Sequence, residues 1–312
     1  MARLIPTTLS GKILIVLCLV LYGCTDERYY ENSHAPLADY AKTHIGNTQL
    51  PIQPDSLKIL AIGNSFTENS VALLPLLLRE HSIKNITLGK ICYGGASLQD
   101  HERFFRNKAQ AYQFQVKLPE EEGWNPKLSD TSIEEAVRYC EWDIIVLQQA
   151  SAASGLPKHY QPYLNRLIEH ILSKSTNPNL TIVWHMTWPY TPKCSTKAFR
   201  PYEYKTAVMY EAIRGATETI LEETGIRYCI PSGTSINRLR DHPFYKDSTD
   251  FTSDGIHIDH PTGQYALACT WFQTIIQPIY GTELHENTAM PVSMEEQTLI
   301  HSIVRSAAAD NH

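Results

Sequence analysis

Residues 57–68 read LKILAIGNSFTE. The first six form an aliphatic run interrupted only by Lys58, which is typical of a buried parallel strand, and Gly63 ends the run. Apolar residues at helical spacing follow up to residue 78, although Pro75 should bend or restart that helix. The segment therefore predicts a strand that turns sharply into a helix.

The same alternation of strand and helix continues along the chain. Short apolar runs predict further strands at residues 85–92, 144–147, 180–186 and 226–230. Amphipathic patterns predict helices at residues 131–140, 160–174, 202–224 and 263–279. Residues 99–115 are polar, rich in aromatic side chains and ambiguous. Such alternation implies βαβ crossovers, so we expect one three-layer α/β/α domain over residues 56–312, with a central parallel sheet.

Composition excludes several classes of protein. With 312 residues, 43% of them hydrophobic, the chain can build a substantial core and is not disordered. Lys and Arg number 27 against 33 Asp and Glu, without a basic block, so we expect no nucleic-acid partner. The seven cysteines form no CxxC pair, which argues against a zinc ribbon and against a disulfide-stapled mini-domain.

The N-terminus carries the pattern of an export signal. Arg3 and Lys12 precede an apolar run at residues 13–22, which is too short to span a bilayer and fits the core of a signal peptide. The run closes on Leu-Tyr-Gly-Cys, which resembles a bacterial lipobox ending at Cys24. We expect residues 1–23 to be a lipoprotein signal peptide and Cys24 to be acylated; the alternative is an ordinary signal peptide with a coincidental cysteine.

The segment behind the signal reads as a tether. Removal of residues 1–23 takes away two cations and no anions, so the mature chain carries 25 basic against 33 acidic residues. Acidic residues directly after Cys24 resemble an export signal to the outer surface of some Gram-negative bacteria. We expect residues 24–55 to be a tether and loosely packed lead-in. The protein would be an outer-membrane lipoprotein, on the periplasmic or the cell-surface face, held by its lipid alone.

In open parallel sheets the functional residues lie beyond the carboxyl ends of the strands. Ser65 occupies such a junction, at the start of the helix after the first strand, where free N–H groups and the helix dipole favour a developing negative charge. Ser65 and Glu68 also match a capping box, so the structural alternative is that Ser65 only caps the helix.

A second candidate group lies near the C-terminus, at Asp254-Gly-Ile-His257. A serine hydroxyl needs a general base, usually a histidine oriented by a carboxylate, and these two residues can converge from one turn. Asp259 and His260 add the possibility of a metal site, but no further ligand cluster of HExxH type occurs, and we expect none.

Two further junctions offer hydrogen-bond donors for an oxyanion. Gly94-Gly95 follows the second strand and can bring a backbone N–H close to a substrate oxygen. Gln148-Gln149 follows the strand at residues 144–147, and a side-chain amide there can donate as well. The plain alternatives are a Gly-Gly turn and polar residues that end a strand.

This order of motifs resembles the SGNH hydrolases, or GDSL-type esterases, over about residues 58–280. The match makes Ser65 the nucleophile, Gly95 (or Gly94) an oxyanion donor, and Asp254 and His257 the rest of a triad. Asn64 stands where the family usually has Asp. Leu147-Gln-Gln replaces the usual Gly-x-Asn-Asp, so the second oxyanion donor would be Gln148, with Gln149 as the alternative. The resemblance also implies a flavodoxin-like sheet.

The resemblance implies a serine esterase that removes a short acyl group, such as acetyl, from a carbohydrate and needs no cofactor. Trp184, Trp188 and Tyr190 are candidates for an exposed sugar platform, although Trp184 also fits the core. Two alternatives stay open. One is an acyltransferase with the same triad, and the other is a glycan-binding lipoprotein that has kept only the fold.

Overall fold

The computed structural model describes residues 36–126, 128–246 and 248–310. Within them one seven-stranded sheet has the order β4-β3-β2-β1-β5-β6-β7. The strands are β1 (Leu57–Gly63), β2 (Ile86–Cys92), β3 (Tyr112–Lys117), β4 (Leu128–Thr131), β5 (Ile144–Leu147), β6 (Thr181–His185) and β7 (Tyr228–Ile230). The strands β2, β1, β5, β6 and β7 pair in parallel, whereas β3 pairs antiparallel with β2 and β4.

The central strands have no solvent face. Every residue of β2, β5 and β6 is buried, and β1 lies between β2 and β5. A strand covered on both faces gains most from continuous apolar sequence, which is why these segments do not alternate between apolar and polar residues. The aliphatic runs therefore predicted the parallel strands well.

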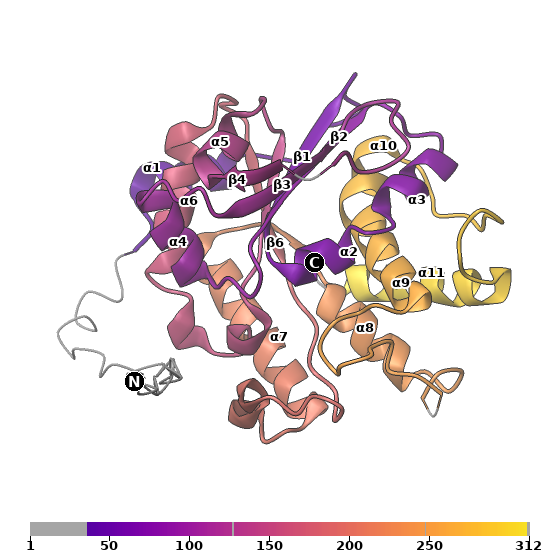
Figure 1. Ribbon diagram of the computed structural model, residues 1–312. Coiled ribbons are helices and arrows are strands. Elements are labelled where there is room, and N and C mark those ends of the chain that lie inside the picture. Colours follow the sequence, from indigo (N-terminus) through magenta and orange to yellow (C-terminus); the bar gives the residue numbers. More distant parts are fainter. Residues whose placement is uncertain (1–35, 127, 247, 311–312) are drawn as a thin grey trace, which may run out of the picture. The chain divides into compact units, whose positions relative to one another are not determined.

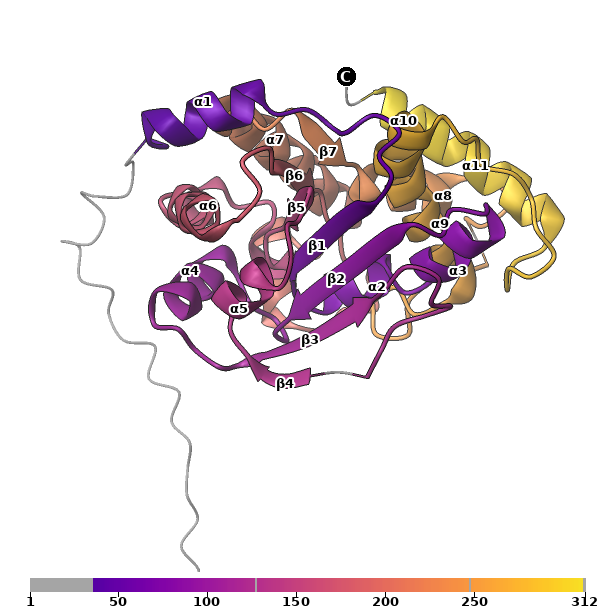
Figure 2. The same cartoon turned by 90° about the horizontal axis from the view of Figure 1, so that it is seen from above.

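Helices cover both faces of this sheet. Figure 2 shows α1, α4, α5 and α6 on one side and α3, α8, α9, α10 and α11 on the other. The helices, labelled in Figure 1, are α1 (Asp39–Asn47), α2 (Ser65–Ser70), α3 (Leu74–Glu80), α4 (Leu98–Arg106), α5 (Ile133–Arg138), α6 (Tyr163–Lys174), α7 (Thr206–Thr224), α8 (Ser232–Asp241), α9 (Pro261–Trp271), α10 (Gln277–Tyr280) and α11 (Met294–Ala309). The predicted three-layer α/β/α architecture is confirmed.

Local sequence signals explain several helix ends. Ser132 caps α5 and Glu135 bonds back to its backbone N–H, as the capping-box pattern predicted. Gly225 ends α7 in the left-handed region at φ 73°. Pro75 stands in the first turn of α3, so the predicted break after α2 is present. These short-range signals act within one turn and do not depend on the rest of the fold.

The sheet differs from the prediction at one edge. The unassigned residues 99–115 contain most of α4 and the start of β3, which returns antiparallel along β2. The edge strand β4 has four residues, three of them exposed, so its sequence carries no apolar run to detect. The sheet is therefore mixed, with a parallel centre and an antiparallel edge.

The lead-in is better packed than expected. Leu37, Ala41 and Ile45 are buried at α1, whose axis lies beside α6. His44 Nε2 donates to Leu180 O at 2.7 Å, and Ala38 N donates to Glu169 at 2.9 Å. The expectation of a loose segment up to residue 55 is wrong for α1, because three small or aliphatic side chains spaced four apart suffice to dock one short helix.

The direction in which successive parallel strands are added to the sheet reverses at β1. The first crossover runs from β1 to β2, and the later ones run outward on the other side from β5 to β6 and β7. The carboxyl ends of β1 and β5 therefore meet at the switch point, which is where ligands bind in open α/β sheets.

The N-terminal predictions lie outside the described residues. These are the signal peptide at residues 1–23 and the acylated Cys24. No helix in the described ranges combines the length and the apolar character that a membrane crossing requires.

Candidate active site

Three side chains from distant parts of the sequence meet beyond the carboxyl end of β1. Ser65 is the first residue of α2, which follows β1 directly, and its Oγ lies 2.9 Å from His257 Nε2. His257 Nδ1 lies 2.6 Å from Asp254 Oδ2. The structure thus brings together all three residues that the motifs predicted, in the order hydroxyl, imidazole, carboxylate.

The carboxylate determines which ring nitrogen of neutral His257 carries the proton. Asp254 Oδ2 can only accept, so Nδ1–H donates to it and the lone pair of Nε2 faces the hydroxyl of Ser65. Burial raises the pKa of Asp254, but hydrogen bonds from the backbone and ring of His257 and from the Ile256 N–H outweigh burial and leave this pKa below its ordinary value. Asp254 is therefore ionised when the imidazole accepts a proton.

The turn that carries Ser65 is capped by its neighbour. Asn64 is the N-cap of α2, and its Oδ1 accepts from Phe66 N at 3.0 Å. The capping-box alternative for Ser65 and Glu68 is wrong, because Ser65 stands one position inside the helix and its hydroxyl bonds to His257. At this first position the Ser65 N–H has no acceptor within the helix.

The glycines after β2 lie next to this turn. Tyr93 N donates to Gly63 O, and Asn64 Nδ2 donates to Ala96 O, so both ends of the loop are tied to the turn between β1 and α2. Gly95 adopts φ 70°, a left-handed conformation that favours glycine. Gly94 and Gly95 are exposed, and in the described part of the chain their N–H groups donate to no backbone carbonyl.

The amide residues after β5 are engaged elsewhere. Gln148 is 2% exposed, and its carboxamide bonds to Asn64, Thr67 and His185. Gln149 is fully buried, and it bonds to Leu98 N, Ala150 N and His159 O. Neither amide is bonded to Ser65. The Gln148 carboxamide therefore bonds to its buried neighbours rather than pointing at Ser65 as the oxyanion prediction requires.

The expected sugar platform after β6 is wrong. Trp184, Trp188 and Tyr190 are 1%, 0% and 3% exposed. Trp188 stacks on Phe66 with ring centroids 4.1 Å apart, and its Nε1–H donates to Ile256 O at 2.9 Å. The indole therefore connects α2 with the turn that carries His257. An aromatic cluster after a strand looks the same in sequence whether it faces a ligand or another loop.

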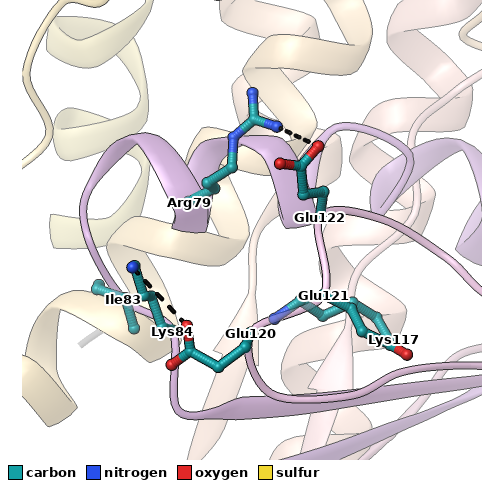
Figure 3. Close-up of a pocket in the computed structure, with 7 residues that line it drawn as sticks. All are labelled: Arg79, Ile83, Lys84, Lys117, Glu120, Glu121 and Glu122. Carbon is teal, nitrogen blue, oxygen red and sulfur yellow. Dashed lines mark ion pairs between the residues drawn. The ribbon is translucent and has the colours of Figure 1, made fainter.

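Besides the Ser65 group, two other kinds of site come into question, a metal centre and a surface depression. The described residues hold no cluster of three His, Cys, Asp or Glu side chains that could bind a metal ion. Figure 3 shows a charged depression near the amino end of β2, the end opposite to the one that the glycine loop follows. Arg79 pairs with Glu122 and Lys84 pairs with Glu120. The depression is lined by Arg79, Ile83, Lys84, Lys117, Glu120, Glu121 and Glu122.

One solved structure shares the fold over most of its length, and others are less similar. A DUF4886 family protein from Bacteroides uniformis is 28% identical, with a TM-score of 0.74 over 82% of this chain and 95% of that chain. A candidate SGNH hydrolase from Slackia heliotrinireducens is 20% identical over 70% of this chain and 98% of that one, with a TM-score of 0.46. An acetylxylan esterase from Geobacillus stearothermophilus is 14% identical over 72% and 96%, with a TM-score of 0.45.

No curated protein matches the sequence. The family model described as a domain of unknown function, DUF4886, matches residues 58–311. This range begins at the second residue of β1, and it includes the rest of the sheet and all three residues of the hydrogen-bonded group at the switch point. The chain belongs to the DUF4886 family.

Proposed function

We propose that the protein is a serine esterase that hydrolyses a short acyl ester of a carbohydrate. The observation that carries this proposal is the continuous hydrogen-bonded series from Ser65 through His257 to Asp254, which links residues 192 positions apart. A serine that only caps a helix needs no imidazole, whereas a nucleophilic serine needs this base and its orienting carboxylate.

The reaction follows from these positions. His257 Nε2 takes the hydroxyl proton while Ser65 Oγ bonds to the ester carbonyl carbon, and the N–H groups of Ser65 and Gly95 (or Gly94) stabilise the oxyanion. His257 then gives the proton to the leaving alcohol oxygen as the ester bond breaks. Water, deprotonated by the same imidazole, attacks the acyl-enzyme, releases the acid and restores the Ser65 hydroxyl.

The openness of the site supports a bulky alcohol group. The side chains of His257 and Asp254 are 38% and 45% exposed, so the leaving-group side of Ser65 faces solvent. Tyr93, which precedes the glycine loop, is 40% exposed, and its ring is held edge-on by Phe104 and Tyr112. A fixed, exposed aromatic ring is a suitable surface for the apolar face of a sugar.

The deciding experiment is the Ser65→Ala variant, assayed with p-nitrophenyl acetate and a panel of acetylated oligosaccharides. We expect turnover to fall on the order of 10⁶-fold, and addition of His257→Ala to cost little more, because triad members act as a unit. The melting temperature should change little, since Asn64 and not Ser65 caps α2.

Ser70→Ala is a matched control in the same helix. Ser70 is fully buried and, among the described residues, its hydroxyl bonds to Thr67 O alone, so this variant should retain turnover. A Ser65→Ala protein with wild-type turnover contradicts the proposal. Acetyl transfer to an added sugar in preference to water would identify the acyltransferase alternative.

We also propose that the chain is an outer-membrane lipoprotein anchored through Cys24, on the strength of the lipobox pattern alone. Cys24→Ala should abolish incorporation of labelled fatty acid and release the protein from the membrane fraction. Cys140→Ala, which removes a half-buried free thiol, is the control and should leave both unchanged. Undiminished membrane association of Cys24→Ala would refute the anchor.

A further inference from the structure

A single hydrogen-bonded chain has one member at or within four residues after the carboxyl end of each of five parallel strands. Its polar groups, in the order β7, β6, β5, β1 and β2, are the Ser232 hydroxyl, the His185 ring, the Gln148 and Asn64 carboxamides and the Ala96 carbonyl. The successive distances are 2.9, 3.1, 2.8 and 3.0 Å. All five residues are buried, none more than 2% exposed.

Backbone groups at one end determine the direction of every bond. Ala96 O can only accept, so Asn64 presents its Nδ2 there and turns Oδ1 toward Phe66 N. Gln148 must then donate from Nε2 to Asn64 Oδ1. The remaining atom, Gln148 Oε1, accepts from Thr67 Oγ1 at 2.8 Å and therefore also from His185 Nδ1–H.

His185 completes the series as a neutral ring. With the proton on Nδ1, its Nε2 accepts the hydroxyl proton of Ser232. Burial lowers the pKa of His185 to about 3, so the ring stays neutral at physiological pH. All donors thus point the same way, from β7 toward the glycine loop after β2.

We propose that Asn64, Gln148 and His185 are positioning residues that hold the Ser65 turn and the Gly94-Gly95 loop in register across the strand ends. The inference rests on the proposed esterase function and extends it from the reacting groups to the layer beneath them. A single side chain joins the Ser65 turn to the Gly94-Gly95 loop, since Asn64 accepts from Phe66 N and donates to Ala96 O.

The hydrogen-bonded chain gives a physical reason for two departures from the SGNH pattern, Asn64 and Gln148. An aspartate at position 64 would have no N–H for Ala96 O and would place a carboxylate oxygen against that carbonyl. A glutamine after β5 has the reach to meet Asn64, Thr67 and His185 at once. Gly63 leaves room for this contact, because a Cβ there would lie 2.1 Å from Thr67 Oγ1.

The test compares Asn64→Asp and Thr67→Val with the matched control Thr270→Val. Thr270 is also a buried threonine whose hydroxyl is hydrogen-bonded, but it lies in α9 and takes no part in the hydrogen-bonded chain from Ser232 to Ala96. We expect Asn64→Asp to lower kcat on p-nitrophenyl acetate by about 100-fold with KM within about twofold, because a displaced oxyanion donor costs this much. Thr67→Val should lower kcat about tenfold, and Thr270→Val should leave it unchanged.

A second readout does not depend on activity. The imidazole ¹⁵N spectrum of His185 should show a neutral ring protonated at Nδ1 at pH 7, and Gln148→Met should alter it. Asn64→Asp and Thr67→Val with wild-type kcat, or a His185 ring protonated at Nε2, would overturn the proposal. A wild-type protein without esterase activity, but with the expected His185 spectrum, would instead count against the proposed function alone.

Discussion

The imidazole of His257 connects a hydroxyl and a carboxylate through its two ring nitrogens. Its position is determined by Asp254, whose Oδ2 accepts from the ring and whose Oδ1 accepts from the backbone N–H groups of Ile256 and His257 at 2.8 Å. One carboxylate therefore shapes the turn and orients the base. These two tasks can be separated by a substitution that keeps Oδ1 and changes Oδ2.

Asp254→Asn makes this separation. The amide oxygen can still accept both backbone N–H groups, but the NH₂ group would face Nδ1 and favour the tautomer that places a proton toward Ser65. We expect kcat to fall by about 10⁴-fold, with the melting temperature almost unchanged.

Asp259→Asn is the control for Asp254→Asn. Asp259 is a carboxylate of the same loop that bonds to Ser253 rather than to His257. It should retain turnover. Equal losses in both variants would show that the whole loop is sensitive to charge rather than that Asp254 orients the base.

At the scale of elements, the turn between Thr252 and Ile258 holds the base against α2. Gly255 O accepts from Thr191 N at 2.9 Å, and Trp188 Nε1–H donates to Ile256 O, so the segment after β6 supports this turn from one side. The turn passes very close to that segment: a Cβ on Gly255 would lie 2.2 Å from Cys194 N. Glycine is required there by space and by its φ of 79°.

Gly255→Ala should therefore impair turnover and stability together. Gly225→Ala is the matched control, because its φ is similar at 73° but no heavy atom lies within 4 Å of the added Cβ. We expect about 1–2 kcal/mol of backbone strain in both variants. Gly255→Ala should lose more stability than this, because its Cβ also clashes with Cys194 N, and it should lose most of its turnover. Urea unfolding and ester hydrolysis measure the two losses. Full activity of a folded Gly255→Ala protein would exclude this account of the turn.

At the scale of the whole molecule, the core contains neutral histidines. Burial lowers the pKa of His101 to about 4 and that of His185 to about 3. Burial also lowers the pKa of His301 to about 4, against an opposing effect of Glu286. Each ring bonds to a buried hydroxyl, those of Tyr112, Ser232 and Tyr265. The folded protein therefore excludes protons that the unfolded chain would bind.

This exclusion predicts acid destabilisation. Between the ordinary histidine pKa of about 6.5 and the lowered values, the unfolded chain binds more protons, so stability falls as pH falls through this window. Three such groups give a slope of at most about 4 kcal/mol per pH unit. The urea midpoint at constant ionic strength should be lower at pH 5 than at pH 7.5. A midpoint that stays constant over this range would show that these rings are protonated in the folded state.

The sequence by itself determined the features that depend on neighbours within one or two turns. The run from Leu57 to Gly63 specified a buried strand, Ser132 with Glu135 specified a helix start, and Gly225 specified a helix end. The alternation of such signals was enough to predict the layered architecture. In open parallel sheets the functional residues lie beyond the carboxyl ends of the strands, and this rule pointed to Ser65 directly after the first strand.

Only the tertiary structure decided which polar group meets which. Asn64, rather than Ser65, caps α2, and Gln148 bonds to Asn64 and His185, 84 and 37 positions away. The antiparallel return of β3 and the burial of Trp188 also escaped the local pattern. A hydrogen bond depends on donor and acceptor positions to within tenths of an ångström. Those positions are defined only after burial of the apolar segments has assembled the sheet.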